Sequence, residues 1–108
     1  MGTVTTHVLD VALGRPAAGV TVRLERPSGA LLAEASTDAD GRIGALGPDD
    51  LPAARYRLTF ATAAYFTATG QSGFFPEVVV VFDLSDPAQH CHVPLLLSPF
   101  AYSTYRGS

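Results

Sequence analysis

Hydrophobic and polar residues alternate along most of this chain, and such alternation is typical of β-strands with one buried face. In the segment 20–26, Val20, Val22 and Leu24 lie on one side, while Thr21, Arg23 and Glu25 lie on the other. Residues that favour turns separate these segments at short intervals. The alternation predicts strands over residues 3–9, 20–26, 31–36, 55–60, 77–84, 91–97 and 100–105.

The stretches between these strands are predicted to be mostly turns and loops. Residues 14–19 are a loop by composition, and 44–52 are irregular. Residues 37–43 form a tight turn, in which Gly41 occupies a position that needs the left-handed backbone conformation. Only residues 61–69, rich in alanine and stopped by Gly70, are expected to form a helix.

Seven or eight short strands with one short helix predict an all-β fold, a two-sheet antiparallel β-sandwich. A parallel α/β fold is excluded, because helices do not alternate with strands. A length of 108 residues is enough for one core, and we expect a single domain over residues 1–108. The segment 77–84 is so apolar that we expect it to be covered on both faces.

Composition narrows the classes of protein that remain. Hydrophobic residues make up 47% of the chain and charged residues 16%, which is typical of a folded globular domain. The net charge is −3 and the basic residues are scattered, which argues against a nucleic-acid partner. All seven basic residues are arginine, so a catalytic lysine that forms a Schiff base is excluded.

Three features concern the compartment. Cys91 is the one cysteine, so no disulfide can form within the chain and nothing favours secretion. No apolar segment at the N-terminus resembles a signal peptide. The longest aliphatic run, residues 78–81, is far too short to cross a membrane. These features predict a soluble cytoplasmic protein without a membrane partner.

Two residues from the first half of the chain could take part in chemistry. His7 lies on the opposite face of its strand from Val4 and Val8, as either a partly exposed strand residue or part of a site. Arg42 follows Asp38-Ala39-Asp40-Gly41, which looks like the start of a calcium loop. The fifth position of such a loop supplies an oxygen ligand, and here it is arginine, so calcium is disfavoured. A hairpin turn that merely exposes Arg42 is the alternative.

A second pair of candidates lies near the C-terminus. His90 and His92 are two residues apart and would project from the same face of a strand. With His7 they would supply three nitrogen ligands, enough for a catalytic zinc ion. Alternatively, His90 is a solvated polar residue that follows Asp86-Pro87.

The end of the chain carries the most specific motif. Residues 90–108 read HCHVPLLLSPFAYSTYRGS and end in Tyr105-Arg106-Gly107-Ser108. This stretch closely resembles the C-terminal signature of the 5-hydroxyisourate hydrolases, transthyretin-like proteins of purine breakdown. Residues 6–20 and the turn before Arg42 resemble the same family. Cys91 departs from the pattern, which usually has tyrosine there, at a position that faces away from the two histidines.

The resemblance implies a function and a set of site residues. It implies hydrolysis of 5-hydroxyisourate to 2-oxo-4-hydroxy-4-carboxy-5-ureidoimidazoline, in a homotetramer without metal or cofactor. The implied catalytic residues are His7, Arg42 and His92, and the implied substrate-binding residues are His7, Arg42, Tyr105 and Ser108. Transthyretin, a hormone carrier, is the alternative within the same fold, but it lacks the closing tetrapeptide and the active-site histidines.

Overall fold

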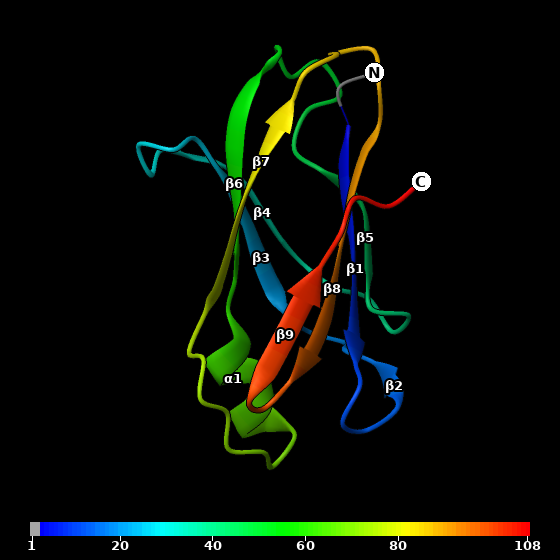
Figure 1. Ribbon diagram of the computed structural model, residues 1–108, viewed down its shortest axis with the longest axis vertical. Coiled ribbons are helices and arrows are strands. Elements are labelled where there is room, and N and C mark those ends of the chain that lie inside the picture. The colour runs from blue at the N-terminus through cyan, green and yellow to red at the C-terminus, as the bar shows by residue number, and fades with distance from the viewer. Residues whose placement is uncertain (1–2) are drawn as a thin grey trace.

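The computed structural model describes residues 3–108, which form two β-sheets packed face to face with one short helix at one end (Figure 1). The helix α1 spans Thr62–Ala68, and no helix of the described residues is long and apolar enough to cross a membrane. The strands are β1 (Val4–Asp10), β2 (Arg15–Pro16), β3 (Thr21–Glu25), β4 (Leu31–Ser36), β5 (Arg42–Leu46), β6 (Ala54–Phe60), β7 (Val78–Leu84), β8 (Cys91–Ser98) and β9 (Ala101–Thr104).

The first sheet has the strand order β2-β1-β8-β9, and β5 also pairs with β1. The second sheet has the order β4-β3-β6-β7. The pairing of β1 with β8 is parallel and sets Thr5 beside His92, whereas the other pairings are antiparallel. The first sheet therefore joins strands from the two ends of the chain.

The predicted two-sheet sandwich with one short helix is confirmed, with two differences. The described residues form nine strands rather than seven or eight, because β2 lies in a predicted loop and β5 extends into the stretch predicted to be irregular. Both short strands form against β1, so a distant partner and not local alternation determines them. The parallel pair also departs from the expected antiparallel sandwich, since alternation does not reveal strand direction.

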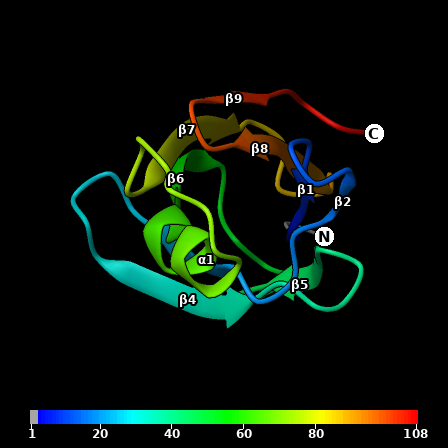
Figure 2. The same cartoon turned by 90° about the horizontal axis from the view of Figure 1, so that it is seen from below.

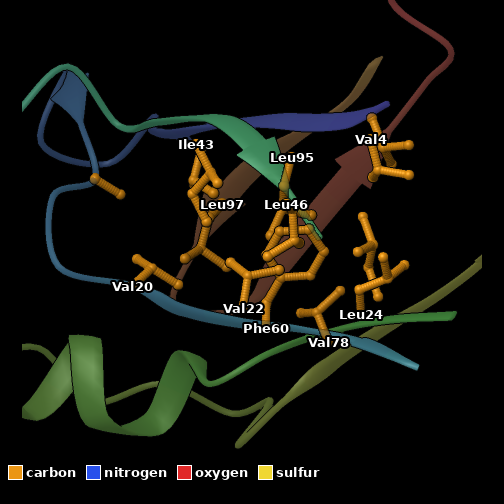
Figure 3. Close-up of a cluster of buried hydrophobic side chains, with 14 of the residues drawn as sticks. Val4, Val20, Val22, Leu24, Ile43, Leu46, Phe60, Val78, Leu95 and Leu97 are labelled. Atoms are coloured by element: carbon orange, nitrogen blue, oxygen red, sulfur yellow. The ribbon is translucent and has the colours of Figure 1, made fainter. Parts of the chain in front are cut away.

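The core lies between the two sheets, where alternate residues of each strand meet (Figure 3). Val22, Leu24 and Phe60 of the second sheet face Val4 and Leu95 of the first, and all five are fully buried. Burying a side chain of this size stabilises the fold by about 1.5–3 kcal/mol. The inward positions predicted for Val22 and Leu24 of β3 are thus confirmed.

The helix closes one end of the sandwich between β6 and β7 (Figure 1). Its Tyr65 and Phe66 are buried. The Tyr65 hydroxyl donates a 2.6 Å hydrogen bond to the carboxylate of Asp10, which is itself buried at the end of β1. Burial raises the pKa of Asp10, but hydrogen bonds from Tyr65, Leu13, Gln71 and Ala12 outweigh it and hold that pKa below its usual value. The helix is therefore tied to β1 by a charged but fully bonded group.

One side of the sandwich is open. The outer strands β7 and β9 run along the same side (Figure 2), and neither has a strand partner on its far edge within residues 3–108. The expectation that the strand around 77–84 is covered on both faces is wrong for this chain, because Val79 and Val81 are 43% and 56% exposed. Phe74 and Phe100 are also exposed.

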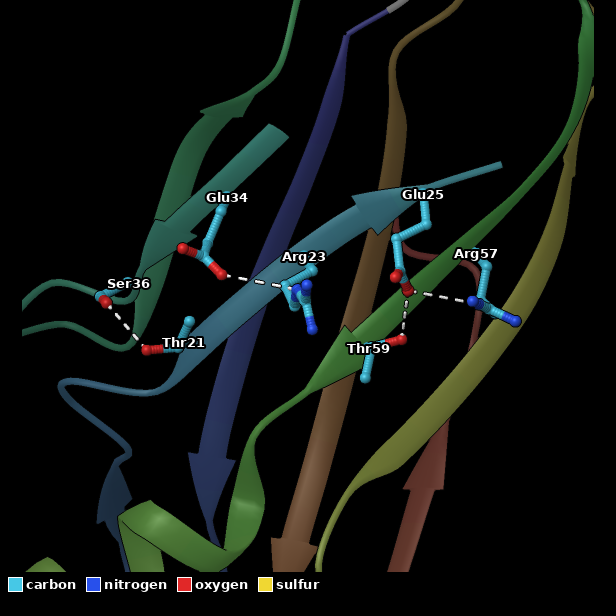
Figure 4. Close-up of polar contacts among 7 residues, drawn as sticks. All are labelled: Thr21, Arg23, Glu25, Glu34, Ser36, Arg57 and Thr59. Carbon is cyan, nitrogen blue, oxygen red and sulfur yellow. Dashed lines mark hydrogen bonds and ion pairs between the residues drawn. The ribbon is translucent and has the colours of Figure 1, made fainter. Parts of the chain in front are cut away.

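Over β3, β4 and β6, the outer face of the second sheet carries polar side chains that pair with one another (Figure 4). Glu25 points outward, as its alternation predicts, yet it is only 6% exposed. The hydroxyl of Thr59 and the guanidinium of Arg57 both bond to its carboxylate, at 2.6 and 3.2 Å. A buried carboxylate is tolerated here because both neighbours donate hydrogen bonds to it and Arg57 also balances its charge.

Candidate active site

The candidate site lies on the outer face of the first sheet, across three neighbouring strands. His7 on β1 is paired directly with Arg42 at the start of β5. On the other side of β1, Thr5 is paired with His92 of β8. Because side chains alternate along a strand and Val4, Ile43 and Val93 face the core, these four side chains share the outer face.

The turn before β5 positions Arg42. The Asp38 carboxylate accepts hydrogen bonds from the backbone amides of Asp40 and Arg42, each at 2.9 Å. Gly41 has φ +74°, and a Cβ there would lie 2.4 Å from the Val8 carbonyl oxygen, so only glycine fits without a shift. The left-handed position predicted for Gly41 is confirmed.

The side chain of Arg42 is exposed and unpaired among the described residues. Its guanidinium makes no hydrogen bond or ion pair with any of residues 3–108. A guanidinium offers five donors in a rigid fork that suits planar oxygen groups. Arg42 is therefore available to an anionic or carbonyl-bearing ligand.

His7 is oriented by the same turn. Its Nε2 lies 3.0 Å from the carbonyl oxygen of Asp40. A carbonyl oxygen only accepts, so the ring donates from Nε2. In the neutral imidazole, the lone pair that can accept a proton is then on Nδ1.

His92 is held from two sides. Its Nδ1 lies 2.7 Å from the hydroxyl of Thr5. On the other side, the Gly107 amide donates to the His92 carbonyl at 2.9 Å, and a Cβ at position 107 would lie 2.4 Å from the ring atom Cδ2. The glycine of the closing tetrapeptide thus lets the tail pack directly against the imidazole.

The surroundings of His92 favour its neutral form. Burial lowers its pKa below the usual imidazole value of 6.5, and the positive charges of His90, Arg42 and His7 lower it further. The ring is therefore uncharged at neutral pH and can accept a proton.

A cavity of about 300 Å³ opens between these groups, which is at the lower end of the range for small-molecule sites. Three predicted site residues, Arg42, His92 and Ser108, line it together. Its lining residues are Thr5, Thr6, Arg42, Ile43, Gly44, His90, His92 and Ser108.

The other two predicted residues lie beside this cavity. His7 is adjacent through its pairing with Arg42 but does not form the cavity wall. Tyr105 lines a second cavity of about 330 Å³, which His92 also borders. That second cavity lies between β7, β8 and the residues after β9, with Val80 and Phe82 on its apolar wall.

Two residues were missed or undervalued by sequence reasoning. His90, expected to be a solvated residue, lies in the cavity wall, and its Nε2 is 2.5 Å from the Thr5 hydroxyl. Thr5 itself was not singled out. The available signal was its position two residues before His7, which puts both on the same face of one strand.

The zinc arrangement suggested by His7, His90 and His92 is not formed. The Thr5 hydroxyl occupies both the Nε2 of His90 and the Nδ1 of His92, and the two rings are 6.0 Å apart at their centroids. No group of three or more metal-ligating side chains is arranged for a metal within residues 3–108. Cys91 points away from the site and packs against the core, as expected from its place in the strand.

The two-sheet topology defines a transthyretin-like β-sandwich. The crystal structure of transthyretin from Sparus aurata superposes with a TM-score of 0.89 at 33% identity, covering 99% of this chain and 97% of that chain. The sequence profile described as HIUase/Transthyretin family matches residues 4–107, and the chain belongs to this family.

Within the family, the chain is similar to proteins named 5-hydroxyisourate hydrolase. The protein of Caulobacter vibrioides is 50% identical over 115 residues, covering 100% of both chains. That of Mus musculus is 46% identical over 110 residues, covering 96% of this chain and 93% of the relative. The structure of Klebsiella pneumoniae 5-hydroxyisourate hydrolase has a TM-score of 0.90 at 44% identity, covering 100% of this chain and 94% of that chain.

Proposed function

We propose that this chain is a hydrolase that opens the cyclic amide of 5-hydroxyisourate to give 2-oxo-4-hydroxy-4-carboxy-5-ureidoimidazoline in urate breakdown. One observation carries the proposal. Arg42, which has no partner among residues 3–108, and the uncharged imidazole of His92 face one cavity that the tail also lines. This is the pair of groups that hydrolysis of a cyclic amide needs. The names of the relatives point to the same substrate.

The residues divide the reaction between them. His92 and His7 activate water and transfer protons, since each offers a ring nitrogen that can accept a proton, and general-base catalysis contributes about 10²–10⁴ in rate. Arg42 holds the planar substrate and stabilises the charge that develops on the carbonyl oxygen. Tyr105 and Ser108 bind the substrate from the tail.

Transport of a hormone-like ligand is the alternative within this fold. The chain resembles a sea bream transthyretin solved in complex with thyroxine, with a TM-score of 0.87 at 34% identity over 97% of this chain and 94% of that chain. The charged and titratable groups in the cavity wall favour the enzyme. Two imidazoles and a guanidinium in its wall suit proton transfer and a polar heterocycle better than an apolar hormone.

The test is a direct assay. The substrate is unstable, so it is generated in place from urate with urate oxidase, and its ultraviolet decay is followed with and without the protein. We expect acceleration that survives dialysis against a strong chelator, because the proposed mechanism uses no metal. Decay at the uncatalysed rate would contradict the function, and activity lost on chelation and restored by zinc would contradict metal independence.

We further propose a homotetramer of single-domain subunits, each comprising residues 1–108, of which 1 and 2 lie outside the described residues. The open strands β7 and β9 and the exposed rings of Phe74, Phe100 and Tyr105 support this assembly. We place the enzyme in the cytoplasm, where the free thiol of Cys91 is stable. Sedimentation should give four times the chain mass of 11.3 kDa, and a fully active monomer would contradict the assembly.

A further inference from the structure

The hydroxyl of Thr5 lies between two imidazoles. It is 2.5 Å from Nε2 of His90 and 2.7 Å from Nδ1 of His92. Thr5 is only 8% exposed, so water has little access to compete for these bonds. The hydroxyl of the next residue does not share this role, because Thr6 donates to the carbonyl of Val93.

A hydroxyl carries one proton and two lone pairs, so it bridges the two rings as both donor and acceptor in only two arrangements. In the first, His90 donates to the Thr5 oxygen, Thr5 donates to Nδ1 of His92, and the His92 proton is on Nε2. In the second, His92 donates from Nδ1 to Thr5, and Thr5 donates to Nε2 of His90. Only the second leaves the lone pair of His92 on Nε2, where a base acting on water needs it.

We propose that Thr5 and His90 are positioning residues of the proposed hydrolase reaction, which hold His92 in the tautomer with a free Nε2 and carry the proton it receives to His90. This inference rests on the proposed function. An O–H bond of water breaks as its proton joins Nε2 of His92, and the hydroxide attacks the substrate carbonyl. The Nδ1 proton of His92 passes to the Thr5 oxygen, and the Thr5 proton passes to Nε2 of His90. The positive charge then rests on His90, and His92 is neutral again.

The surroundings explain the direction of this transfer. His92 is half-buried, and its lowered pKa shows that a charge on its ring is unfavourable. The charges of His90, Arg42 and His7 lower this pKa, and Ser108 lies in the same cavity wall. The second cavity that His92 borders also has Asp83, Asp86, Tyr105 and Arg106 in its wall. His90 is exposed, so water solvates a charge there. The parallel register of β1 and β8 holds Thr5 beside His92.

The first variants alter the hydroxyl alone. Thr5→Val keeps the shape of the side chain and removes the bridge, and we expect kcat to fall about tenfold or more with KM within about twofold, because base catalysis is impaired while binding is not. Thr5→Ser retains the hydroxyl and should restore kcat to within about threefold of the parent. Thr21→Val removes an exposed hydroxyl on the second sheet and should change neither constant. Circular dichroism melts check folding.

The second set tests the path through His90. His90→Gln can still hydrogen-bond to Thr5 but cannot take up a proton, so kcat should again fall about tenfold, and the acid limb of the pH–rate profile should move. The double variant, which combines Thr5→Val with His90→Gln, should have a kcat no lower than that of Thr5→Val alone, because both changes break the same proton path. Multiplied losses, or an unchanged kcat in either single variant, would overturn the relay.

The same experiment separates this inference from the proposed function. A parent protein inactive on 5-hydroxyisourate removes the function and the relay together. An active parent whose Thr5→Val variant is folded and equally fast removes only the relay. If Thr5→Val fails to fold, His90→Gln decides, because its exposed side chain lies outside the core.

Discussion

The arginines on the outer faces of the two sheets differ in whether a carboxylate pairs with them. On the second sheet each arginine of β3 and β6 has a carboxylate partner within 3.5 Å, and Figure 4 shows two of these pairs. On the first sheet, Arg42 has no partner among residues 3–108, and the imidazoles beside it bond to a hydroxyl and a carbonyl. The pairs are Arg23 with Glu34, Arg55 with Asp83, and Arg57 with Glu25.

The difference distinguishes arginines that form ion pairs within the fold from an arginine that is available to a ligand. Exposed pairs on the second sheet each contribute only about 0–1 kcal/mol, but they leave no guanidinium free to bind a ligand. The first sheet gathers positive and titratable groups around a cavity whose wall, among residues 3–108, contains no carboxylate side chain. Such a cluster keeps its imidazole neutral and its guanidinium available, as the proposed reaction requires.

Replacing Arg42 should have the largest effect on activity. Arg42→Lys keeps the charge but loses the forked donors, so we expect kcat/KM to fall about 100-fold or more. The melting temperature should not change, because the side chain has no partner among the described residues to lose. Arg23→Lys on the second sheet is the matched control and should keep full activity. A loss below about threefold in Arg42→Lys would remove the functional distinction between the two faces.

Changes in the tail, residues 105–108, should have the second largest effect on activity. In Gly107→Ala the new methyl group would overlap the His92 ring, and displacing a catalytic group by about 1 Å can cost as much as 100-fold, so we expect a loss of about tenfold or more in kcat. Deleting residues 105–108 should cost at least as much activity while the fold is retained. Rates and circular dichroism melts of both variants measure this. A folded, tetrameric truncation as fast as the parent would exclude the tail from the site.

Glu25→Gln should change stability and leave activity unchanged. The hydrogen bond from Thr59 lowers the pKa of Glu25 and is the largest influence on it. Burial raises this pKa, but Arg57 and Arg23 lower it further, so that it lies below its usual value of 4.5. The carboxylate therefore stabilises the fold above pH 4.5, and this contribution is lost as the pH falls through the lowered pKa. At pH 7 the variant should lose about 1–3 kcal/mol of unfolding free energy.

The measurement is denaturant unfolding of parent and variant at several pH values. The difference between them should shrink as the pH falls below 4.5. A difference that stays constant with pH, or a fall in kcat, would show that Glu25 does not have this purely structural role.

Local alternation was enough to predict most of this fold. It identified β3, β4 and β6 as strands and the inward face of β3, because apolar and polar residues alternate along that segment. It missed most of β5, whose glycine and alanine are poor strand formers and whose partner β1 is distant. It also overstated the burial of β7, since an apolar strand face looks the same whether the protein or a partner covers it.

Those candidate site residues that belong to sequence motifs could be selected from the sequence. The motif match selected Arg42, His92, Ser108 and His7 as candidates. In the structure the first three line one cavity and His7 lies beside Arg42, while their roles stay predictions. The role of Thr5 could not be predicted, because threonine is common in strands and only the register with β8 brings it to His92. The second cavity at Tyr105 depends on how the tail leaves β9, which no local pattern encodes.

The parallel pairing of β1 with β8 also has a consequence for biosynthesis. Thr5 and His92 are 87 positions apart, so at about 5–20 residues per second the ribosome needs roughly 4–17 s between making one and the other. The second sheet pairs neighbouring hairpins and can form during that interval. The edge of β1 that pairs with β8 stays unpaired until β8 has been made. The nascent chain is therefore inert as an enzyme until β8 and the tail have left the exit tunnel, and chaperones that shield β1 would act within that window.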